Sequence, residues 1–351
     1  MLDVVIIGGG QAGLAAAYYL NQSRARFLIV EKGPSIGDSW RQRYDSLQLF
    51  TPRKHSQLPG LLLSGRPEGF PGKDEVADYL SAYAVNFSLP VQFNTEVMSA
   101  FAVSGGFVIE TTRGVLQARN IIAATGPFHV PFIPPFANQI SAGVTQLHSS
   151  VYRNKNQLKK GNVLVVGAGN SGAQIAVELA GAFDVRLSAS RPLHFMPLTL
   201  FGKSIFDYYE TFGLLRAGQL TKRGIWLKRQ PEQIYGLDLQ KRLKDKTIAL
   251  LPKAVQAEGN ILTFEDGRRL EADNVIWATG FRSDFSWLKL EDHGGRQQNV
   301  CHQDGVSNVP GLYFIGLPWL TCRGSALLGW VRHDAKRIVQ HILGTSSIGI
   351  Q

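Results

Sequence analysis

The chain has 351 residues, more than one typical domain, so its length predicts two domains. Hydrophobic residues make up 44% of it, which is enough for a large core, and its formal net charge is +10. Basic clusters at 153–160, 222–229 and 241–246 come with no helix-turn-helix, zinc-finger or aromatic RNA-binding motif. We therefore expect a field that attracts anionic dinucleotides, and no nucleic-acid partner.

The two cysteines, Cys301 and Cys322, are too few for a disulfide framework, and their spacing is not that of a CxxC dithiol. Cys301 precedes His302, but this neighbourhood offers too few further ligands, and no metal is predicted. The first strand begins without a secretion signal, and no apolar run is long enough to cross a bilayer. A cytoplasmic protein with no membrane insertion is the expectation.

The chain opens on a nucleotide-binding pattern. Four β-branched residues, 4–7, predict a strand buried on both faces, and a run of helix formers, 14–20, predicts a helix. Between them lies GxGxxG, in which the glycines allow a tight turn, a close approach to pyrophosphate, and tight helix–strand packing. The predicted binding residues are Gly8, Gly10, Gln11, Ala12 and Gly13.

A second predicted strand, 27–30, ends in Glu31, which lies 31 − 8 = 23 residues after the first glycine. A carboxylate at this spacing accepts hydrogen bonds from an adenosine ribose. Strand, glycines, helix and acid in this order favour a nucleotide with a free ribose, for which FAD is the prediction.

The remainder of the first half mixes short elements and loops. Residues 33–60 are rich in turn formers and predict an irregular segment over the nucleotide. Residues 75–84 predict a helix, and 91–93 and 107–111 predict strands. The strand 120–124 ends in Thr125 and Gly126, 127–135 is a proline-rich connector, and 147–160 is a polar, basic linker.

The opening pattern then returns. A strand at 163–166 precedes Gly167, Gly169 and Gly172, and each glycine lies 159 residues after its counterpart (167 − 8, 169 − 10, 172 − 13). The segment 116–126, LQARNIIAATG, also matches 270–280, LEADNVIWATG. The chain therefore contains two related nucleotide-binding units.

These repeats predict an α/β fold with two Rossmann-like dinucleotide-binding domains of the glutathione-reductase-like type. Each domain has a mainly parallel sheet and a small antiparallel β layer. The expected division is a discontinuous FAD-binding domain, 1–155 plus 281–351, with an NADPH-binding domain, 156–280, inserted into it.

The two units differ at the acid. Adding 159 to Glu31 gives Ser190, which is followed by Arg191. A serine and a guanidinium accept the 2′-phosphate that a carboxylate would repel, so NADPH is predicted here. The alternative is that Arg191 only lies on the surface. The predicted NADPH residues are Gly167, Gly169, Asn170, Ser171, Gly172, Ser190, Arg191, Thr279 and Gly280.

Residues 195–253 are less regular and rich in aromatic side chains, and we interpret them as an insertion packed on the second unit. A strand at 311–316 then returns to the first domain, and Ser325 is predicted to cap a final helix. The small polar tail, 344–351, is expected to fray.

Together these residues resemble the flavin-containing monooxygenase superfamily, above all the bacterial flavoproteins associated with cation efflux (CzcO-like), and more distantly the plant YUCCA-type enzymes. The likeness rests on GGGQAG, LQLFTP, GAGNSG, both Ala-Thr-Gly strands and the ending 312–335. It implies FAD contacts at Lys32, Gly37, Ser39, Trp40, Thr51, Pro52, Val97, Thr125, Gly126, Gly316, Ala326 and Leu327. One departure is the FxGxxxH signature: Ser141 replaces the phenylalanine, and four residues separate Gly143 from His148.

The resemblance implies a monooxygenase in which NADPH reduces FAD and the reduced flavin activates O2 toward a small soft nucleophile or ketone. Asn170 and Ser171 are candidates for positioning the nicotinamide, although both residue types also cap helices. His148 is a candidate polar partner, although a lone histidine is more often structural. Two alternatives stay open: a flavin oxidoreductase or electron-transfer flavoprotein without oxygenation, and a flavin-binding regulator linked to ion transport. A homodimer is possible.

Overall fold

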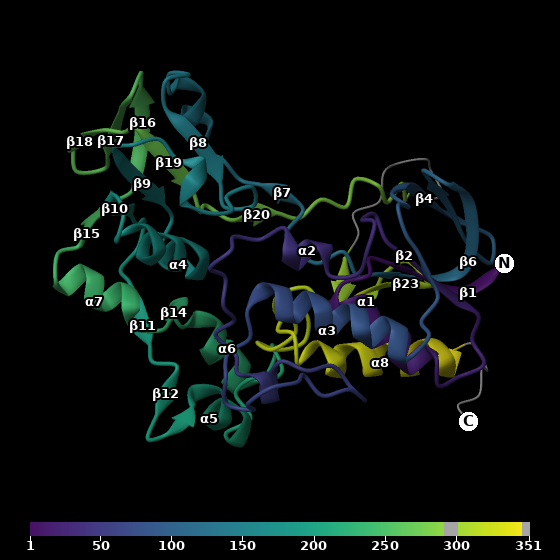
Figure 1. Cartoon of the computed structure of the whole chain (residues 1–351). Helices are drawn as coiled ribbons and strands as arrows, with labels where there is room; N and C mark the ends of the chain where they lie inside the picture. The colour runs from purple at the N-terminus through teal and green to yellow at the C-terminus, as the bar shows by residue number, and fades with distance from the viewer. Residues whose placement is uncertain (291–300, 346–351) are drawn as a thin grey trace.

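The computed structural model describes residues 1–290 and 301–345, and Figure 1 shows two sheets, each with its own helices. The first sheet has the order β21-β22-β23-β6-β1-β2-β3. β1 (Leu2–Ile7) lies between β2 (Phe27–Val30) and β6 (Gly114–Ala123) and is parallel to both. Val4, Val5 and Ile6 are fully buried, as predicted for a strand covered on both faces.

The edges of the first sheet are short. β3 (Val91–Gln92) and β23 (Leu312–Phe314) extend it in parallel. β21 (His302–Gln303) and β22 (Val306–Ser307) add antiparallel strands beyond β23.

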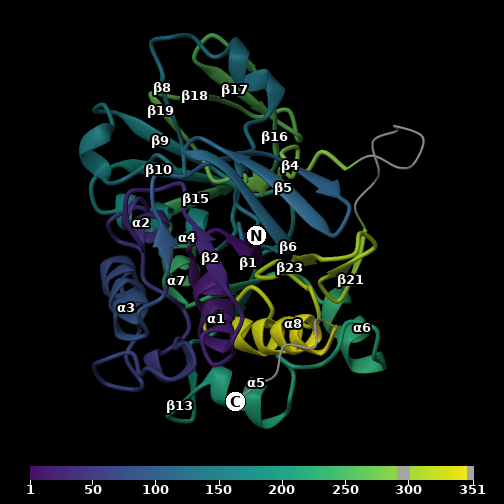
Figure 2. The ribbon, with the colours of Figure 1, turned by 90° about the vertical axis from the view of Figure 1, so that its right-hand side faces the viewer.

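Two layers cover the first sheet (Figure 2). On one face, α1 (Gln11–Leu20), α3 (Lys73–Asn86) and α8 (Val331–Thr345) share a buried core with β1. On the other face, β4 (Val97–Val103) and β5 (Gly106–Thr111) form an antiparallel ribbon that continues into β6. This is the predicted antiparallel layer.

The last helix begins later than predicted. Ser325 does not cap it, because the Ser325 hydroxyl accepts the backbone N–H groups of Thr321 (3.0 Å) and Cys322 (3.1 Å) and closes a turn. α8 starts six residues further on, at Val331, after a run of turns. Of the tail predicted to fray, 344 and 345 belong to α8, and 346–351 lie outside the described residues.

The second sheet is parallel, with the order β15-β10-β9-β19-β8. Its strands are β8 (Thr145–His148), β9 (Asn162–Val166), β10 (Asp184–Ser188), β15 (Ile248–Leu251) and β19 (Asn274–Trp277). α4 (Asn170–Leu179) and α7 (Asp238–Lys244) share one core with it. The antiparallel layer β16 (Ala254–Glu258), β17 (Ile261–Phe264) and β18 (Arg269–Glu271) contributes to the core on the other face.

The predicted linker at 147–160 was partly wrong, because its first residues complete β8. This strand pairs in parallel with β19, with His148 opposite Trp277. The second sheet therefore begins at Thr145, before the boundary predicted between 155 and 156. Four residues of the pattern TQLH carry too little alternation to reveal a strand.

The chain crosses between the two sheets on a narrow ribbon. β7 (Val130–Pro131) carries it out, and β20 (Phe281–Arg282) brings it back in antiparallel pairing. The guanidinium of Arg43 lies over the rings of both Phe128 and Phe281, at 5.4 and 5.6 Å from their centroids. This cation joins the loop after α2 (Asp38–Arg41) to the crossover.

The aromatic insertion contacts both units, not the second alone. It comprises β11 (His194–Met196), β12 (Thr199–Leu200), β13 (Lys203–Ser204), α5 (Ile205–Thr211), α6 (Lys222–Arg229) and β14 (Gln233–Tyr235). Phe206 packs against Trp330 and stacks on Phe50, both from the first unit. The sequence shows that the insertion is rich in aromatic residues, but it does not show that they pack on the first unit.

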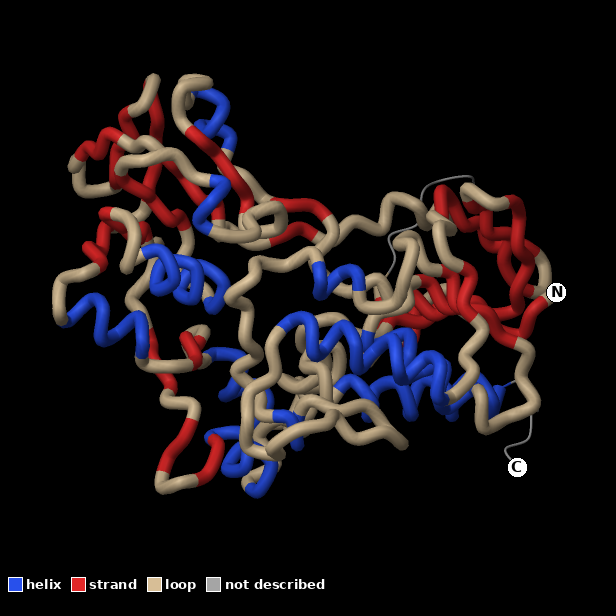
Figure 3. Tube along the Cα trace, viewed as in Figure 1, coloured by secondary structure: helices blue, strands red, loops and turns tan. Residues whose placement is uncertain are grey.

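Loops and short turns fill the space between these elements (Figure 3). The short helices are α2 (Asp38–Arg41), η1 (Arg53–His55), η2 (Pro135–Gln139) and η3 (Lys155–Gln157). Within the described ranges, no helix combines the length and the apolar character that crossing a bilayer requires.

Candidate functional site

Each unit opens with the same backbone turn after its first strand. Gly8 has φ +106° and Gly167 has φ +105°, a region that residues with a side chain rarely adopt. The N–H of Gly8 donates to Val30 O, and that of Gly167 donates to Ser188 O, both at 2.9 Å. We call Gly8, Gly10 and Gly13 the first cradle, and Gly167, Gly169 and Gly172 the second cradle.

The third glycine of each cradle lets the helix lie against the turn. A Cβ on Gly13 would lie 2.0 Å from Gly8 O, and one on Gly172 would lie 1.9 Å from Gly167 O. No side chain fits at these distances, so the spacing of the motif follows directly from the packing.

The second glycine of each cradle faces open space. Gly10 and Gly169 precede α1 and α4 with nearly identical dihedrals (φ −75°, ψ −174° and φ −72°, ψ −177°). A Cβ at either position would have no atom of residues 1–290 or 301–345 within 4 Å. Each cradle therefore offers a free helix N-terminus beside an open backbone, which suits a pyrophosphate group.

The strand that closes each unit has the same register. Val4 pairs with Asn120, and Val163 pairs with Asn274. After β6, the Thr125 hydroxyl is buried without a hydrogen-bond partner among the described residues. At the matching position of the second unit, the Thr279 hydroxyl donates to Phe132 O. An orphaned buried hydroxyl beside the first cradle fits a polar group of a bound nucleotide.

Glu31 lies at the mouth of the first cradle. One carboxylate oxygen accepts Gly9 N–H (2.6 Å) and the other accepts Gly33 N–H (2.8 Å). Each oxygen keeps a second acceptor site, so the carboxylate can also accept ribose hydroxyls. A hydrogen bond from Gly9 therefore joins the glycine turn to Glu31. The spacing of the motif predicts that the acid lies near the turn, but it does not predict this bond.

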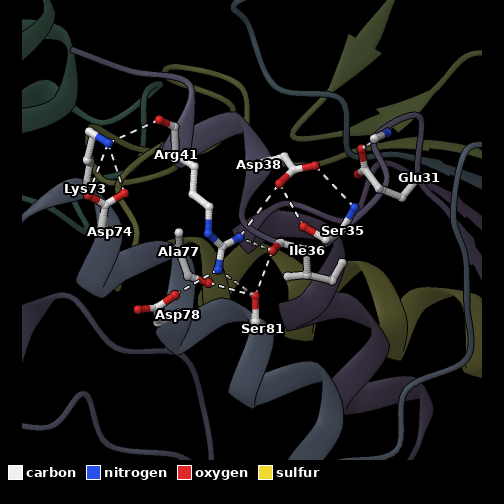
Figure 4. A network of polar contacts seen from close by, with 11 residues as sticks. Glu31, Ser35, Ile36, Asp38, Arg41, Lys73, Asp74, Ala77, Asp78 and Ser81 are labelled. Atoms are coloured by element: carbon white, nitrogen blue, oxygen red, sulfur yellow. Dashed lines mark hydrogen bonds and ion pairs between the residues drawn. The ribbon is translucent and has the colours of Figure 1, made fainter. Parts of the chain in front are cut away.

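A clamp holds the segment after Glu31 on α3 (Figure 4). The Arg41 guanidinium donates to Ile36 O and to Asp78, both at 2.8 Å, and the Ser81 hydroxyl donates to Ile36 O at 2.7 Å. Gly37, with φ +90°, approaches so closely that a Cβ would lie 2.6 Å from Ala77 O. This clamp fixes α2, which carries Ser39 and Trp40.

The other residues with predicted FAD contacts are placed as follows. The side chains of Thr51 and Lys32 already have partners: Thr51 pairs with Ser56 Oγ (2.7 Å), and Lys32 forms an exposed ion pair with Glu96 (2.6 Å). Gly316 turns against the start of α1, where its Cβ would meet Ala12. Pro52 is buried, Trp40, Val97, Ala326 and Leu327 are half-buried, and Gly126 has φ +73°.

At the second cradle, Ser190 and Arg191 follow β10 and are both exposed. In the part of the chain that the structure describes, neither side chain has a hydrogen bond, and Arg191 has no ion pair. Its guanidinium is therefore available to an anion.

Asn170 and Ser171 begin α4, but the Asn170 side chain is occupied. Its Oδ1 accepts Tyr235 N–H (2.9 Å), and its Nδ2 donates to Gln233 O (3.3 Å). Asn170 therefore positions β14 and neither caps the helix nor leaves its amide free. Ser171 is exposed, next to Asn170 at the start of α4. On the same helix, Gln174 accepts a hydrogen bond from the Tyr44 hydroxyl, whose pKa burial raises to about 12.

His148 is buried at the end of β8, with both ring nitrogens engaged. Ser150 N–H donates to Nδ1 (3.1 Å), so Nε2 carries the proton and donates to Gly280 O (3.0 Å). Burial lowers its pKa, so the ring is neutral. Both ring nitrogens thus have partners within the protein, and a role of His148 in catalysis stays a prediction.

Contacts that join the two units were not predicted. On α4, Gln174 accepts from Tyr44 OH (3.0 Å), and Glu178 accepts from the Ser46 hydroxyl. On α5, Asp207 accepts from Lys54 Nζ (2.8 Å) and pairs with His55 Nε2 (2.7 Å). Of these residues, only Asp207 belongs to a pattern visible in the sequence, the capping box Ser204–Asp207. A capping box indicates where a helix starts, but not that Asp207 contacts Lys54 and His55.

Comparisons with known proteins show the family of the chain. A model of the pyridine nucleotide-disulphide oxidoreductase family matches residues 5–192. A CzcO-like oxidoreductase from Geobacillus kaustophilus is 47% identical over 346 residues, which cover 98% of this chain and 99% of that protein. The indole-3-pyruvate monooxygenase YUCCA1 of rice is 30% identical over 383 residues, 96% of this chain and 90% of that protein.

Among solved structures, a flavin-containing monooxygenase from Stenotrophomonas maltophilia superposes with a TM-score of 0.80 at 26% identity, covering 98% of this chain and 99% of that chain. The paired cradles and these likenesses define an FAD-dependent oxidoreductase, and the predicted cofactors, FAD and NADPH, are those of this class. The chain belongs to the pyridine nucleotide-disulphide oxidoreductase family and, within it, to the CzcO-like oxidoreductases.

Proposed function

We propose that the chain is an NADPH-dependent FAD monooxygenase that oxygenates a small soft nucleophile or a ketone. The observation that carries this proposal is the pair of matched cradles, one beside Glu31 and the other beside Ser190 and Arg191. When bound, FAD accepts a hydride from NADPH and activates O2, so that one oxygen atom enters the substrate and the other leaves as water.

In this proposal the first cradle holds the FAD pyrophosphate, and Glu31 accepts the ribose hydroxyls. The clamp around Arg41 and the orphaned Thr125 hydroxyl complete that site. The second cradle holds the NADPH pyrophosphate, and Arg191 pairs with the 2′-phosphate. Asn170 keeps β14, and with it Tyr235, in place beside the second cradle.

The cysteines favour an acceptor other than a disulfide. Cys301 is exposed and Cys322 is buried, and neither forms a disulfide. Reduced flavin therefore has no CxxC pair in this sequence to receive its electrons. The names of two relatives, the rice indole-3-pyruvate monooxygenase and the S. maltophilia flavin-containing monooxygenase, support O2 as the acceptor.

The test follows the oxygen atoms. Purified FAD-loaded protein is supplied with NADPH and 18O-labelled O2 in the presence of thioethers, amines and ketones. We expect at least one substrate to gain one labelled oxygen atom, with one NADPH oxidised for each product formed. If every NADPH yields one hydrogen peroxide with the whole panel and no product is labelled, the protein is an oxidase or reductase, not a monooxygenase.

The cytoplasm and a homodimer stay predictions. The two free cysteines suit a reducing compartment. Fractionation of cells tests the compartment, and sedimentation equilibrium tests the oligomeric state.

A further inference from the structure

The insertion exposes apolar side chains beside cations on one helix. α6 buries Gly224 and Leu227, and a Cβ on Gly224 would lie 2.0 Å from Gly218 O. Gln219, just before the helix, donates its backbone N–H to Thr321 O (2.7 Å) and its side-chain N–H to Leu320 O (3.1 Å). The helix is therefore firmly held, and Figure 2 shows it at the outer edge of the molecule.

The opposite side of this helix points outward. Residues three and four apart share a helix face, so Lys222, Ile225, Trp226 and Arg229 lie together, with Leu220 just ahead of the Thr221 cap. Leu220 is 72% exposed, Trp226 56% and Ile225 41%, and both cations are exposed as well. We call these five residues the outward face of α6.

The segment that carries the outward face has charges of one sign. Residues 211–231 contain five cations and no acid: Arg216, Lys222, Arg223, Lys228 and Arg229. Within the described residues no carboxylate pairs with the four cations of α6. Lys222 and Arg223 also occupy the first turn, where the helix dipole favours acids. Arg223 donates to Phe212 O (2.9 Å), and Lys228 lies over the Trp319 ring. Packing within the protein explains neither the other two cations, Lys222 and Arg229, nor an exposed tryptophan.

We propose that the outward face of α6 docks the protein on an anionic bilayer surface. Cations beside exposed Trp, Leu and Ile suit the interface, where apolar side chains enter the acyl boundary and cations meet anionic headgroups. A second copy of the chain does not fit, because a twofold contact would oppose two positive patches. A nucleic acid would use the cations but leave the apolar side chains uncovered. Docking of this kind needs no spanning helix.

The test is flotation of the FAD-loaded protein with vesicles of phosphatidylcholine and phosphatidylglycerol, and with vesicles of phosphatidylcholine alone. We expect binding to the anionic vesicles only, weakened by salt. Replacing two cations in Lys222→Gln/Arg229→Gln should lower the partition about 30-fold. The matched control is Lys241→Gln/Lys244→Gln on α7, which removes two exposed cations from a helix without exposed aromatic residues and should change little.

The apolar half is tested by Trp226→Ser/Leu220→Ser, which should lower the partition about 10-fold or more. The matched control is Leu62→Ser/Val85→Ser, at side chains 75% and 79% exposed elsewhere on the surface. Retained flavin absorbance shows that each variant is folded. The proposal is overturned if the wild type does not float with anionic vesicles, or if the α7 control loses as much binding as the α6 variant. It is also overturned if Trp226→Ser/Leu220→Ser binds like the wild type, which would indicate a purely electrostatic contact with an acidic protein or a nucleic acid.

Discussion

The two cradles share a backbone and differ in what surrounds it. Their first glycines agree to one degree in φ, and their third glycines face the same carbonyl contact. Beside the first cradle, a carboxylate accepts two backbone N–H groups, and beside the second a guanidinium is exposed. The repeated backbone suits a pyrophosphate in both units, so the side chains after the second strand must discriminate between the nucleotides.

A second difference concerns how firmly each cradle is enclosed. The Arg41 clamp fixes the segment after Glu31 to α3, and Gly37 packs directly on Ala77. Ser190 and Arg191 lie in an exposed loop instead. We expect the first cradle to retain its nucleotide through turnover and the second to exchange its nucleotide in every cycle.

The largest effects are expected from filling one cradle at a time. Gly10→Val and Gly169→Val each place a side chain in the open space that we assign to a pyrophosphate, where an added Cβ has no described neighbour within 4 Å. Gly10→Val should be purified without flavin. Gly169→Val should be yellow but should not be bleached by NADPH. Absorbance of the purified proteins, with and without NADPH under nitrogen, checks both outcomes.

Dithionite is the control for this pair of variants. It reduces flavin directly, without NADPH bound at the second cradle, so it should still bleach Gly169→Val. The assignment of the cradles is wrong if Gly169→Val is the colourless variant and Gly10→Val is the yellow one.

Glu31→Gln should have the next largest effect. The amide keeps one acceptor oxygen but loses the charge and the second acceptor, at a cost of about 3 kcal/mol in FAD affinity. Titration of the apoprotein with FAD, followed by flavin fluorescence, measures this loss. Asp38→Asn, a neighbouring acid whose oxygens accept from Ser35, is the matched control and should retain most of the affinity. An unchanged FAD affinity in Glu31→Gln would mean that this carboxylate does not bind the ribose of FAD.

The sequence was sufficient to predict the two cradles. The glycine spacing specified both turns and their helices, because each glycine has a steric reason that no other residue satisfies. Contacts between distant segments carry no such local signature. Tyr44 with Gln174 and Asp207 with Lys54 join residues more than a hundred positions apart, and ordinary polar residues serve at all four. The partners of Asn170, on β14, and of His148, Ser150 and Gly280, were not predicted for the same reason, and the roles predicted for the two side chains stay predictions.

Arg191→Ala separates the two coenzymes. It removes a charged contact to the 2′-phosphate, so NADPH should bind about 1.5–3 kcal/mol more weakly while NADH binds nearly as before. Arg268→Ala, at an exposed arginine paired with Asp266, is the matched control. Rapid-reaction measurement of flavin reduction over a range of each coenzyme gives the two dissociation constants. Equal losses for NADPH and NADH would leave Arg191 a surface residue and the second cradle without a selective group.

The smallest effect concerns stability of the second unit at low pH. Burial lowers the pKa of His148, so over the interval below its ordinary value of about 6.5 the unfolded chain binds a proton that the folded chain does not. This residue's contribution to stability is fully present above that value and is lost as the pH falls toward the lowered pKa. Urea unfolding at about pH 7.5 and about pH 5.5 measures the change.

His148→Gln removes the titration and should be less sensitive to pH than the wild type across this interval. Burial also lowers the pKa of His302 and His333, which belong to the first unit, but both remain in the variant and cancel in the comparison. Equal pH dependence in the two proteins would mean that the ring is protonated without cost. Its hydrogen bond from Ser150 N–H, and with it the assigned tautomer, would then be wrong. Because bound FAD stabilises the folded chain, the two proteins are compared at the same FAD concentration.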